Sequence, residues 1–353
     1  MYIQSVTLKN FRCFSAFTLD FDSPITLIEG ANASGKTSLL EALHYACYLR
    51  SFRTHLPREM LAFGQDTFVI KVHGTSSESD WNLHVGFSGK KRLIKIDEKH
   101  ISSYKELVER YRVISSIEDD LMLIKGGPDI RRTFMDQSIL LENPTLISTM
   151  RRYSTVVDQR NALLAQPGCD SISYDIWTQQ LWELSALIQA GRKQFLSNLE
   201  REVNILLEKF FEVDSSITLE YCPKRCDLTT SYESFRAENP TLFQDERLFR
   251  RSLFGVHLDD CRINFLNKSS KTYASRGQQK LLILLIKVAQ LRLLNNSVII
   301  ILDDFMTDFD DKNSKILLDM LISLNVQIIL TCPTEGLLRT HLSSYTHQRV
   351  KLP

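Results

Sequence analysis

Glycine and proline are scarce in this chain, with 13 and 9 residues among 353. A chain poor in both does not resemble disordered or loop-dominated sequences. No apolar run reaches the length of about 18 residues that a membrane-spanning helix needs. The opening residues, MYIQSVTLKNFRCF, lack the apolar core of a signal peptide. We therefore expect a cytoplasmic protein that does not associate with membranes.

A surplus of charge of one sign is also missing, since 43 Lys and Arg residues face 42 Asp and Glu residues. The net charge of +1 excludes a protein that binds nucleic acid through its overall charge, but it allows a local basic patch. Seven scattered cysteines, an odd number, do not form the pattern of a disulfide framework. The nearest pair, Cys222 and Cys226, has no second pair with which to complete a zinc site.

The sequence has α/β character at both ends and helical character in the middle. Its length suits two domains, or one domain with a large insertion. Alternating apolar residues, continuous apolar runs and helical spacing predict the elements. We expect strands at 5–8, 17–21, 24–29, 217–221, 298–302 and 326–330, an antiparallel meander at 67–101, and helices at 37–48, 129–165, 175–213, 278–294 and 312–324, with a polar stretch over 222–247.

The helix expected over 175–213 is unusually long. Its apolar residues, from Trp177 to Phe210, recur mostly at spacings of three or four. A continuous helix of roughly 35 residues spans about 50 Å, which is too long for a compact domain and favours an antiparallel arm of paired helices. The alternative is two ordinary helices broken near Gly191.

Residues 30–37, GANASGKT, follow a buried-strand pattern and open a helix. They satisfy G-x-x-x-x-G-K-[ST], the pattern of a phosphate-binding loop, in the required context. Backbone N–H groups of such a loop converge on a β-phosphate at the positive end of the helix dipole. We expect Lys36 to reach the β- and γ-phosphates and Thr37 to bind Mg²⁺; a turn without a ligand is the alternative. The predicted nucleotide-binding residues are Gly30, Ala31, Asn32, Ala33, Ser34, Gly35, Lys36, Thr37 and Ser38.

Two acids end a second apolar strand, in the run VIIILDD at 298–304. Asp303 is expected to hold Mg²⁺ through water, and Asp304 to polarise the attacking water. Paired acids at a strand end also cap helices, which is the alternative here.

A third motif, SRGQ at 275–278, stands at a predicted helix start, ahead of the two acids. Alone it would be a helix cap. In the order phosphate loop, SRGQ, double acid, it resembles the signature of ABC ATPases, in which Ser275, Gly277 and Gln278 would contact the γ-phosphate bound to the opposite subunit.

With these motifs in place, the whole chain resembles the RecF family, recombination-mediator ATPases related to the heads of SMC proteins. The resemblance implies an α/β fold: a P-loop ABC-type ATPase head with an inserted α-helical arm. We predict the head at 1–120 and 250–353, and the arm at 121–249. The segments that carry the resemblance are LKNFR at 8–12, the phosphate loop, SFR at 51–53, EDDL at 118–121, KGGP at 125–128, RRTFMD at 131–136, RNALL at 160–164, 255–280 and LDDF at 302–305.

Several positions depart from the family pattern. Ala33 stands where the family usually has glycine, which matters if that residue needs a positive φ. The run GVHLDD at 255–260 replaces GPHRDD, and TDFD at 307–310 replaces SELD while keeping Asp310. Thr331 stands where transporter ATPases have a switch histidine, which argues against a transporter subunit.

The resemblance implies a head that binds ATP and Mg²⁺, dimerises around two nucleotides, binds DNA and hydrolyses ATP slowly. It also implies action at single-strand gaps and duplex junctions with the RecO and RecR proteins, to help load RecA. Arg12 is expected to approach the nucleotide, with a surface salt bridge as the alternative. Basic clusters that are candidates for DNA contact are Arg50, Arg53 and Arg58; Lys90, Lys91, Arg92 and Lys95; Arg131 and Arg132; and Arg151 and Arg152.

Two other functions remain open from the sequence. One is the ATPase engine of a membrane transporter. The other is an ATP-gated scaffold in which hydrolysis is incidental, because Asp304 in place of the usual glutamate polarises water less well.

Overall fold

A computed structural model describes residues 1–76, 79–89, 91–101, 104–168, 170–211, 216–225, 227–228, 230–294, 298–304, 309–333, 342 and 345–352. The chain divides into two compact units. The first comprises 1–121, 206–213 and 275–353, and the second 122–205 and 214–274. Residues 250–274, which the sequence prediction assigns to the head, lie in the second unit.

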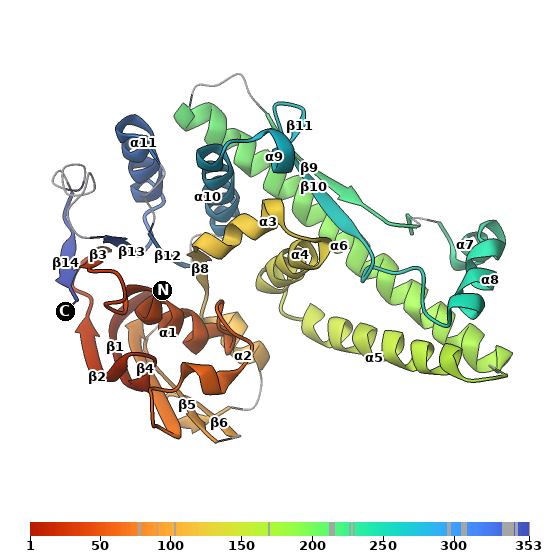
Figure 1. Ribbon diagram of the computed structural model, residues 1–353, viewed down its shortest axis with the longest axis horizontal. Coiled ribbons are helices and arrows are strands. Elements are labelled where there is room, and N and C mark those ends of the chain that lie inside the picture. Colours follow the sequence, from red (N-terminus) through yellow and green to blue (C-terminus); the bar gives the residue numbers. More distant parts are fainter. Residues whose placement is uncertain are drawn as a thin grey trace. The chain divides into compact units, whose positions relative to one another are not determined.

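The first unit contains a six-stranded antiparallel sheet in the order β2-β1-β4-β5-β6-β7 (Figure 1). Alternation along its strands buries one side chain in two, so that Val6, Leu8, Ile70 and Val85 form part of the core. The predicted meander over 67–101 is confirmed. The strands are β1 (Tyr2–Phe11), β2 (Phe14–Asp20), β4 (Thr67–Thr75), β5 (Asp80–Ser88), β6 (Lys91–Ile96) and β7 (Lys99–His100).

The same unit holds a parallel five-stranded sheet in the order β14-β3-β13-β12-β8. Its central strands are buried on both faces, which explains why they read as continuous apolar runs. The strands are β3 (Ile25–Gly30), β8 (Val113–Ser116), β12 (Ile299–Leu302), β13 (Ile328–Pro333) and β14 (Gln348–Lys351). The helices of this unit are α1 (Lys36–Tyr48), η1 (Pro57–Met60), α2 (Tyr104–Arg110), η2 (Glu118–Leu121), α10 (Arg276–Leu293) and α11 (Asp311–Ile322).

Strand register decides which loops meet. Leu302 of β12 lies opposite Leu330 of β13, which lies opposite Leu27 of β3. Because these strands are parallel, the segments after all three leave the sheet at the same edge, where ligands bind in such folds. The phosphate-loop pattern and the double acid are therefore neighbours, although about 270 residues separate them in the sequence.

The second unit is mainly helical. The segment expected as one helix over 129–165 is two helices, α4 (Pro128–Glu142) and α5 (Leu146–Ala165). Pro144 accounts for the break, because proline disfavours helical conformation in the residue before it and lacks an N–H. In contrast, α6 (Ser171–Phe211) runs unbroken through Gly191, so the alternative of two helices there is wrong. Helices α5 and α6 lie side by side and are joined by the Arg160–Thr178 hydrogen bond (Figure 1).

Two short helices that the composition did not predict lie in the polar stretch over 222–247, and the second extends just beyond it. Ser231 caps the first by accepting from the N–H of Ser234, and Pro240 opens the second. A three-stranded antiparallel sheet in the order β11-β10-β9 completes the unit. These elements are α3 (Met122–Lys125), β9 (Ile217–Cys222), α7 (Tyr232–Glu238), α8 (Pro240–Phe249), β10 (Asp260–Phe265), β11 (Lys268–Ser269) and α9 (Ser270–Tyr273).

Among the residues that the structure describes, no helix combines the length and the apolar character needed to cross a membrane.

Candidate functional site: a phosphate loop beside two acids

The predicted phosphate loop connects β3 to α1. Gly35 is the N-cap of α1 with φ 101°, and an added Cβ there would come within 2.7 Å of Phe14 Cζ and 2.8 Å of Cys13 Sγ, so only glycine fits. Ala33 adopts φ 68°, which is left-handed. The family glycine at this position would therefore relieve backbone strain that the alanine retains.

Lys36 lies in the first turn of α1 and is 6% exposed. Its Nζ donates to the carbonyl oxygens of Gly30, at 2.7 Å, and Ala31, at 3.0 Å. The ammonium group is thus held inside the loop by neutral acceptors. An anionic acceptor entering the loop would bind it more strongly than the two carbonyls do.

The residues predicted for Mg²⁺ are in direct contact. The Thr37 hydroxyl donates to Asp303 Oδ2 at 2.7 Å. The other carboxylate oxygen of Asp303 accepts from the Thr331 hydroxyl at 2.8 Å. Thr331 Oγ1 in turn accepts from the N–H of Asp304 at 3.0 Å.

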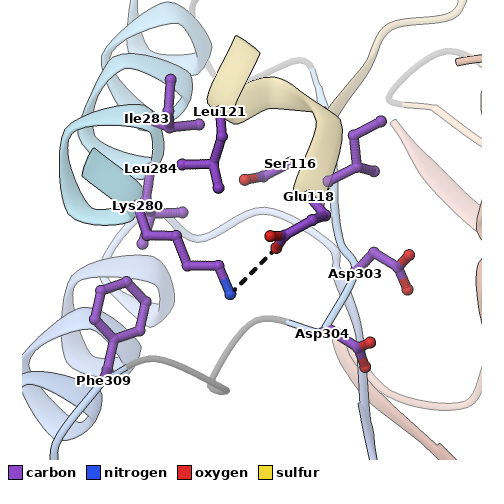
Figure 2. A pocket seen from close by; sticks show the side chains of 10 residues that line it. Ser116, Glu118, Leu121, Lys280, Ile283, Leu284, Asp303, Asp304 and Phe309 are labelled. Atoms are coloured by element: carbon purple, nitrogen blue, oxygen red, sulfur yellow. Dashed lines mark ion pairs between the residues drawn. The ribbon is translucent and has the colours of Figure 1, made fainter. Parts of the chain in front are cut away.

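Asp304 follows Asp303 in a left-handed conformation, with φ 44°. Burial and the neighbouring Asp303 carboxylate raise the pKa of Asp304, while Lys36 and Lys280 oppose that rise. Both acids line a cavity of about 30 Å³, which has room for about one or two water molecules (Figure 2). The cavity is lined by Ser116, Ile117, Glu118, Leu121, Lys280, Ile283, Leu284, Asp303, Asp304 and Phe309.

Helix α10, which follows the SRGQ motif, is tied to this cavity by ion pairs. Glu118 accepts from Arg276 at 2.8 Å and lies 3.5 Å from Lys280 Nζ, and Figure 2 shows the latter contact beside the two acids. About two turns further along α10, Lys287 pairs with Asp120 at 2.8 Å. The EDDL motif therefore anchors α10.

Ser275 and Gln278 form a capping box at the start of α10. Ser275 Oγ accepts from the N–H of Gln278, and Gln278 Oε1 accepts from the N–H of Ser275. The helix-cap alternative is thus realised within this chain. It is compatible with the predicted role of Ser275, Gly277 and Gln278 toward a second subunit, which stays a prediction.

Arg12 forms a bidentate ion pair with Glu41 of α1, at 2.8 and 2.6 Å, and donates to the carbonyl of Glu59. Glu41 is fully buried and also accepts from Ser51 at 2.5 Å, with Arg53 3.7 Å away. The NFR and SFR motifs therefore converge on one buried carboxylate. Arg12 is held by this pair, and its predicted contact with nucleotide stays a prediction.

Several residues of the basic clusters are bound by nearby acceptors. In the second unit, Arg131 pairs with Asp260 at 2.7 Å and Arg132 donates to the carbonyl of Asp259 at 2.8 Å. The RRTFMD and GVHLDD motifs thus bind each other, which explains both as packing motifs. In the first unit, Lys95 pairs with Glu98.

Other basic residues face solvent. Arg58 and Arg92, both exposed, line one open depression on the first unit together with Leu56 and Phe87. Arg151 and Arg152 are exposed on α5. Lys90 lies outside the described residues, as do Thr307 and Asp308 of the TDFD element.

The donor set fits a nucleotide phosphate and Mg²⁺. Among the residues that the structure describes, Ser34 Oγ is buried at the loop without a hydrogen-bond partner, and the hydrogen bonds of Lys36 go to carbonyls that an anion can replace. A hydroxyl and a carboxylate in contact are the hard oxygen ligands that Mg²⁺ takes, with phosphate and water supplying the rest. No cluster of three His, Cys, Asp or Glu side chains suited to a metal occurs in the described part of the chain.

The sequence placed Thr331 at the switch position and Glu118 in the EDDL motif, but it did not predict their contacts at the site, and it gave Lys280 no role. One signal for Thr331 was available, since it directly follows the apolar strand expected at 326–330, as the acids follow theirs. Which strand lies beside which is a tertiary fact, however, and the contact was out of reach without it.

Comparison with known proteins agrees with this geometry. The AAA domain family model matches residues 5–217. The chain is 30% identical to the DNA replication and repair protein RecF of Enterococcus faecalis, covering 94% of this chain and 92% of that one. It is 29% identical to the protein of the same name from an Exiguobacterium species, covering 99% and 95%.

Solved structures show the same fold. A RecF–ATP structure from the RecFOR pathway superposes with a TM-score of 0.84 at 23% identity, covering 95% of both chains. An Smc head domain from Pyrococcus furiosus superposes with a TM-score of 0.56 at 13% identity, covering 96% of this chain and 91% of that one. The predicted fold class, an α/β P-loop head of the SMC-like ABC type with a helical arm, is confirmed.

Proposed function

The chain belongs to the RecF family of DNA replication and repair proteins, and on that basis we propose that it is an ATP-dependent, DNA-binding recombination mediator. It would act in the cytoplasm, bind ATP and Mg²⁺, dimerise on ATP at single-strand gaps and junctions, and assist RecA loading. The observation that carries the proposal is the contact of Thr37 with Asp303 beside Lys36.

The residues of the loop and the strand ends would divide the work. Lys36 would leave the carbonyls of Gly30 and Ala31 and donate to phosphate oxygens. Thr37 would bind Mg²⁺ and Asp303 would hold it through water, and the ion would neutralise phosphate charge when bound. Asp304, which lines the small cavity, would orient the attacking water and accept its proton.

Dimerisation would complete the site. Ser275, Gly277 and Gln278 stand at the N-terminus of α10, where backbone N–H groups and the helix dipole favour an anion. Supplied by an opposite subunit, this end would close over the γ-phosphate. Hydrolysis would be slow, because Asp304, in place of the usual glutamate, polarises water less well.

DNA is the proposed macromolecular partner, and family membership also suggests the RecR and RecO proteins. The described ion pairs favour Arg58 and Arg92 over Arg131 and Arg132 as phosphate contacts, since the latter bind Asp260 and the Asp259 carbonyl. Such contacts weaken steeply with salt. Family membership, the helical arm and Thr331 together argue against the transporter alternative.

Sedimentation of the purified protein tests the proposal. With ATP–Mg²⁺ and a gapped duplex we expect a DNA-bound dimer, and with ADP a monomer. Lys36→Met should abolish the ATP-induced dimer. Arg58→Gln/Arg92→Gln should dimerise normally but bind DNA at least tenfold more weakly, whereas Lys105→Gln, an exposed cation elsewhere in the first unit, should bind as the wild type does.

A chain that ignores ATP, or that dimerises without gaining DNA affinity, would contradict the proposal. The variant Asp304→Asn distinguishes the proposed function from the scaffold alternative. If hydrolysis matters, this variant should trap the dimer on DNA; an unchanged dwell time would favour a scaffold.

A further inference from the structure

Thr331 is buried at the edge of the parallel sheet from which the phosphate loop and the two acids extend. It lies in β13, between the phosphate-loop strand β3 and the acid strand β12, and it is 0% exposed. Register places it opposite Ile28 of β3 and one residue beyond the Leu330–Leu302 pair, beside the start of the two acids. The hydroxyl of this buried threonine is hydrogen-bonded to both acids.

The hydroxyl of Thr331 has a fixed hydrogen-bond direction. It accepts from the N–H of Asp304 at 3.0 Å, and its one proton goes to Asp303 Oδ1 at 2.8 Å. Asp303 Oδ2 accepts from the Thr37 hydroxyl at 2.7 Å. The result is a single chain of hydrogen bonds, Asp304 N–H to Thr331 to Asp303, with Thr37 meeting the far side of the same carboxylate.

This chain determines the geometry of both acids. Because both of its oxygens accept hydrogen bonds, the Asp303 carboxylate cannot rotate, and it keeps a fixed orientation toward Thr37. Asp304 has a left-handed backbone, with φ 44°, which is unfavourable for a residue with a Cβ. The bond from its N–H to Thr331 helps to hold that conformation, which directs the carboxylate toward the small cavity.

We propose that Thr331 is a positioning residue for the nucleotide site: its hydroxyl sets Asp303 for Mg²⁺ and holds Asp304 at the water cavity. The inference rests on the proposed ATPase function and adds a residue to it. A hydroxyl that merely satisfied buried polar groups would affect stability alone. A positioning hydroxyl also changes the Mg²⁺ requirement, because partners behind a metal ligand typically alter metal affinity by about 10- to 100-fold.

Thr331→Val and Thr331→Ser are the informative variants. Valine keeps the shape and removes both hydrogen bonds, whereas serine keeps the hydroxyl. Thr26→Val is the matched control, since Thr26 lies in the adjacent strand β3, is 0% exposed, and bonds to Gln348 rather than to the acids. The measurements are binding of a fluorescent ATP analogue with and without Mg²⁺, and turnover as a function of Mg²⁺.

For Thr331→Val we expect nucleotide affinity without Mg²⁺ within twofold of wild type. The Mg²⁺ concentration for half-maximal binding should rise about tenfold, and kcat should fall at least tenfold. Thr331→Ser should restore both values to within about threefold of wild type, and Thr26→Val should leave both within twofold. An unchanged Mg²⁺ requirement in Thr331→Val, failure of serine to restore it, or an equal effect of Thr26→Val would each overturn the inference.

Wild-type protein separates this outcome from failure of the proposed function. If the wild type binds no nucleotide, the proposed function fails and the inference falls with it. If the wild type binds nucleotide but does not turn it over, the Mg²⁺ dependence of binding still decides the role of Thr331.

Discussion

Two buried cations, one in each unit, are held in opposite ways. Lys36 in the phosphate loop is 6% exposed and donates to two backbone carbonyls. Arg160 in α5 is fully buried, and all five of its N–H donors have partners. Those partners are Thr178, Ser252, Tyr174 and both oxygens of Glu246.

Glu246 is equally saturated. Besides Arg160 it accepts from the Tyr174 hydroxyl at 2.8 Å and from the N–H of Leu253 at 2.7 Å. The rings of Tyr174 and Phe254 flank the guanidinium at 4.8 and 5.1 Å. A charge bound this completely has no capacity left for a ligand, so RNALL is a structural motif of the arm.

The contrast shows how to separate a structural buried charge from a functional one. Both are buried, and both stand in a motif of the family. What differs is the acceptors: a paired carboxylate with full hydrogen bonding fixes a fold, whereas neutral carbonyls release a lysine to a better anion. Saturation of the donors is therefore more informative than burial.

The largest expected effect comes from breaking the saturated site. Arg160→Met leaves Glu246 buried without its counter-charge and should lower the free energy of unfolding by about 3–5 kcal/mol, measured by urea denaturation. Lys36→Met leaves only the two neutral carbonyls of Gly30 and Ala31 without this donor. It should therefore lower the free energy of unfolding by less than about 1 kcal/mol in the absence of nucleotide. Similar losses in the two variants would contradict the comparison.

Arg160→Met/Glu246→Leu serves as the control, since removing both charges should recover much of the loss. Arg236→Met breaks the half-exposed Arg236–Asp175 ion pair in the same unit. It should lower the free energy of unfolding by less than about 1 kcal/mol.

A second pair of variants tests backbone strain in the second unit. Gly255 has φ 115°, and an added Cβ would come within 2.8 Å of the Tyr153 hydroxyl, which is itself held by His257 at 2.6 Å. Gly255→Ala should therefore destabilise by about 2 kcal/mol. Gly191→Ala, whose Cβ meets nothing closer than Ile139 Cδ1 at 3.9 Å in mid-helix, should stabilise by about 0.5–1 kcal/mol. Differential scanning calorimetry would register opposite shifts in Tm, and shifts of the same sign would refute this account.

The smallest expected effect concerns strain that the head retains. Ala33→Gly removes the penalty of a Cβ at φ 68° but adds chain entropy to the unfolded state, so we expect a net gain of about 0.5 kcal/mol by chemical denaturation. Ala162→Gly, within α5, should instead lose about 1 kcal/mol. A loss in Ala33→Gly comparable to that control would mean that the loop is not strained there.

Local patterns predicted much of the fold because they depend on neighbours in the chain. The phosphate loop, the acid strand and the long helix each follow from spacing or composition within a short window. One error has a local cause too, since Pro144 divides a helix that periodicity joined. The continuous helix expected over 175–213 is confirmed, and it runs through Gly191. The two helices α7 and α8 were missed because, at 7 and 10 residues, they show only short apolar patterns.

Arginines were the hardest residues to interpret from the sequence. Arg12, Arg131 and Arg132 each looked available for a phosphate, yet each is bound by an acid or a carbonyl far along the chain. A side chain's partner depends on which strands and helices pack together, and no local pattern records it.

By itself, the sequence determined the chemistry that is present: a lysine and a hydroxyl at the start of a helix, two acids at the end of a strand, and the order of the motifs. Only the tertiary structure decided which of these groups meet. The parallel register of β3, β13 and β12 brings Thr37, Thr331 and Asp303 into one hydrogen-bonded chain. The physical reason is that covalent neighbours set local conformation, whereas contacts between distant residues follow from how buried strands align.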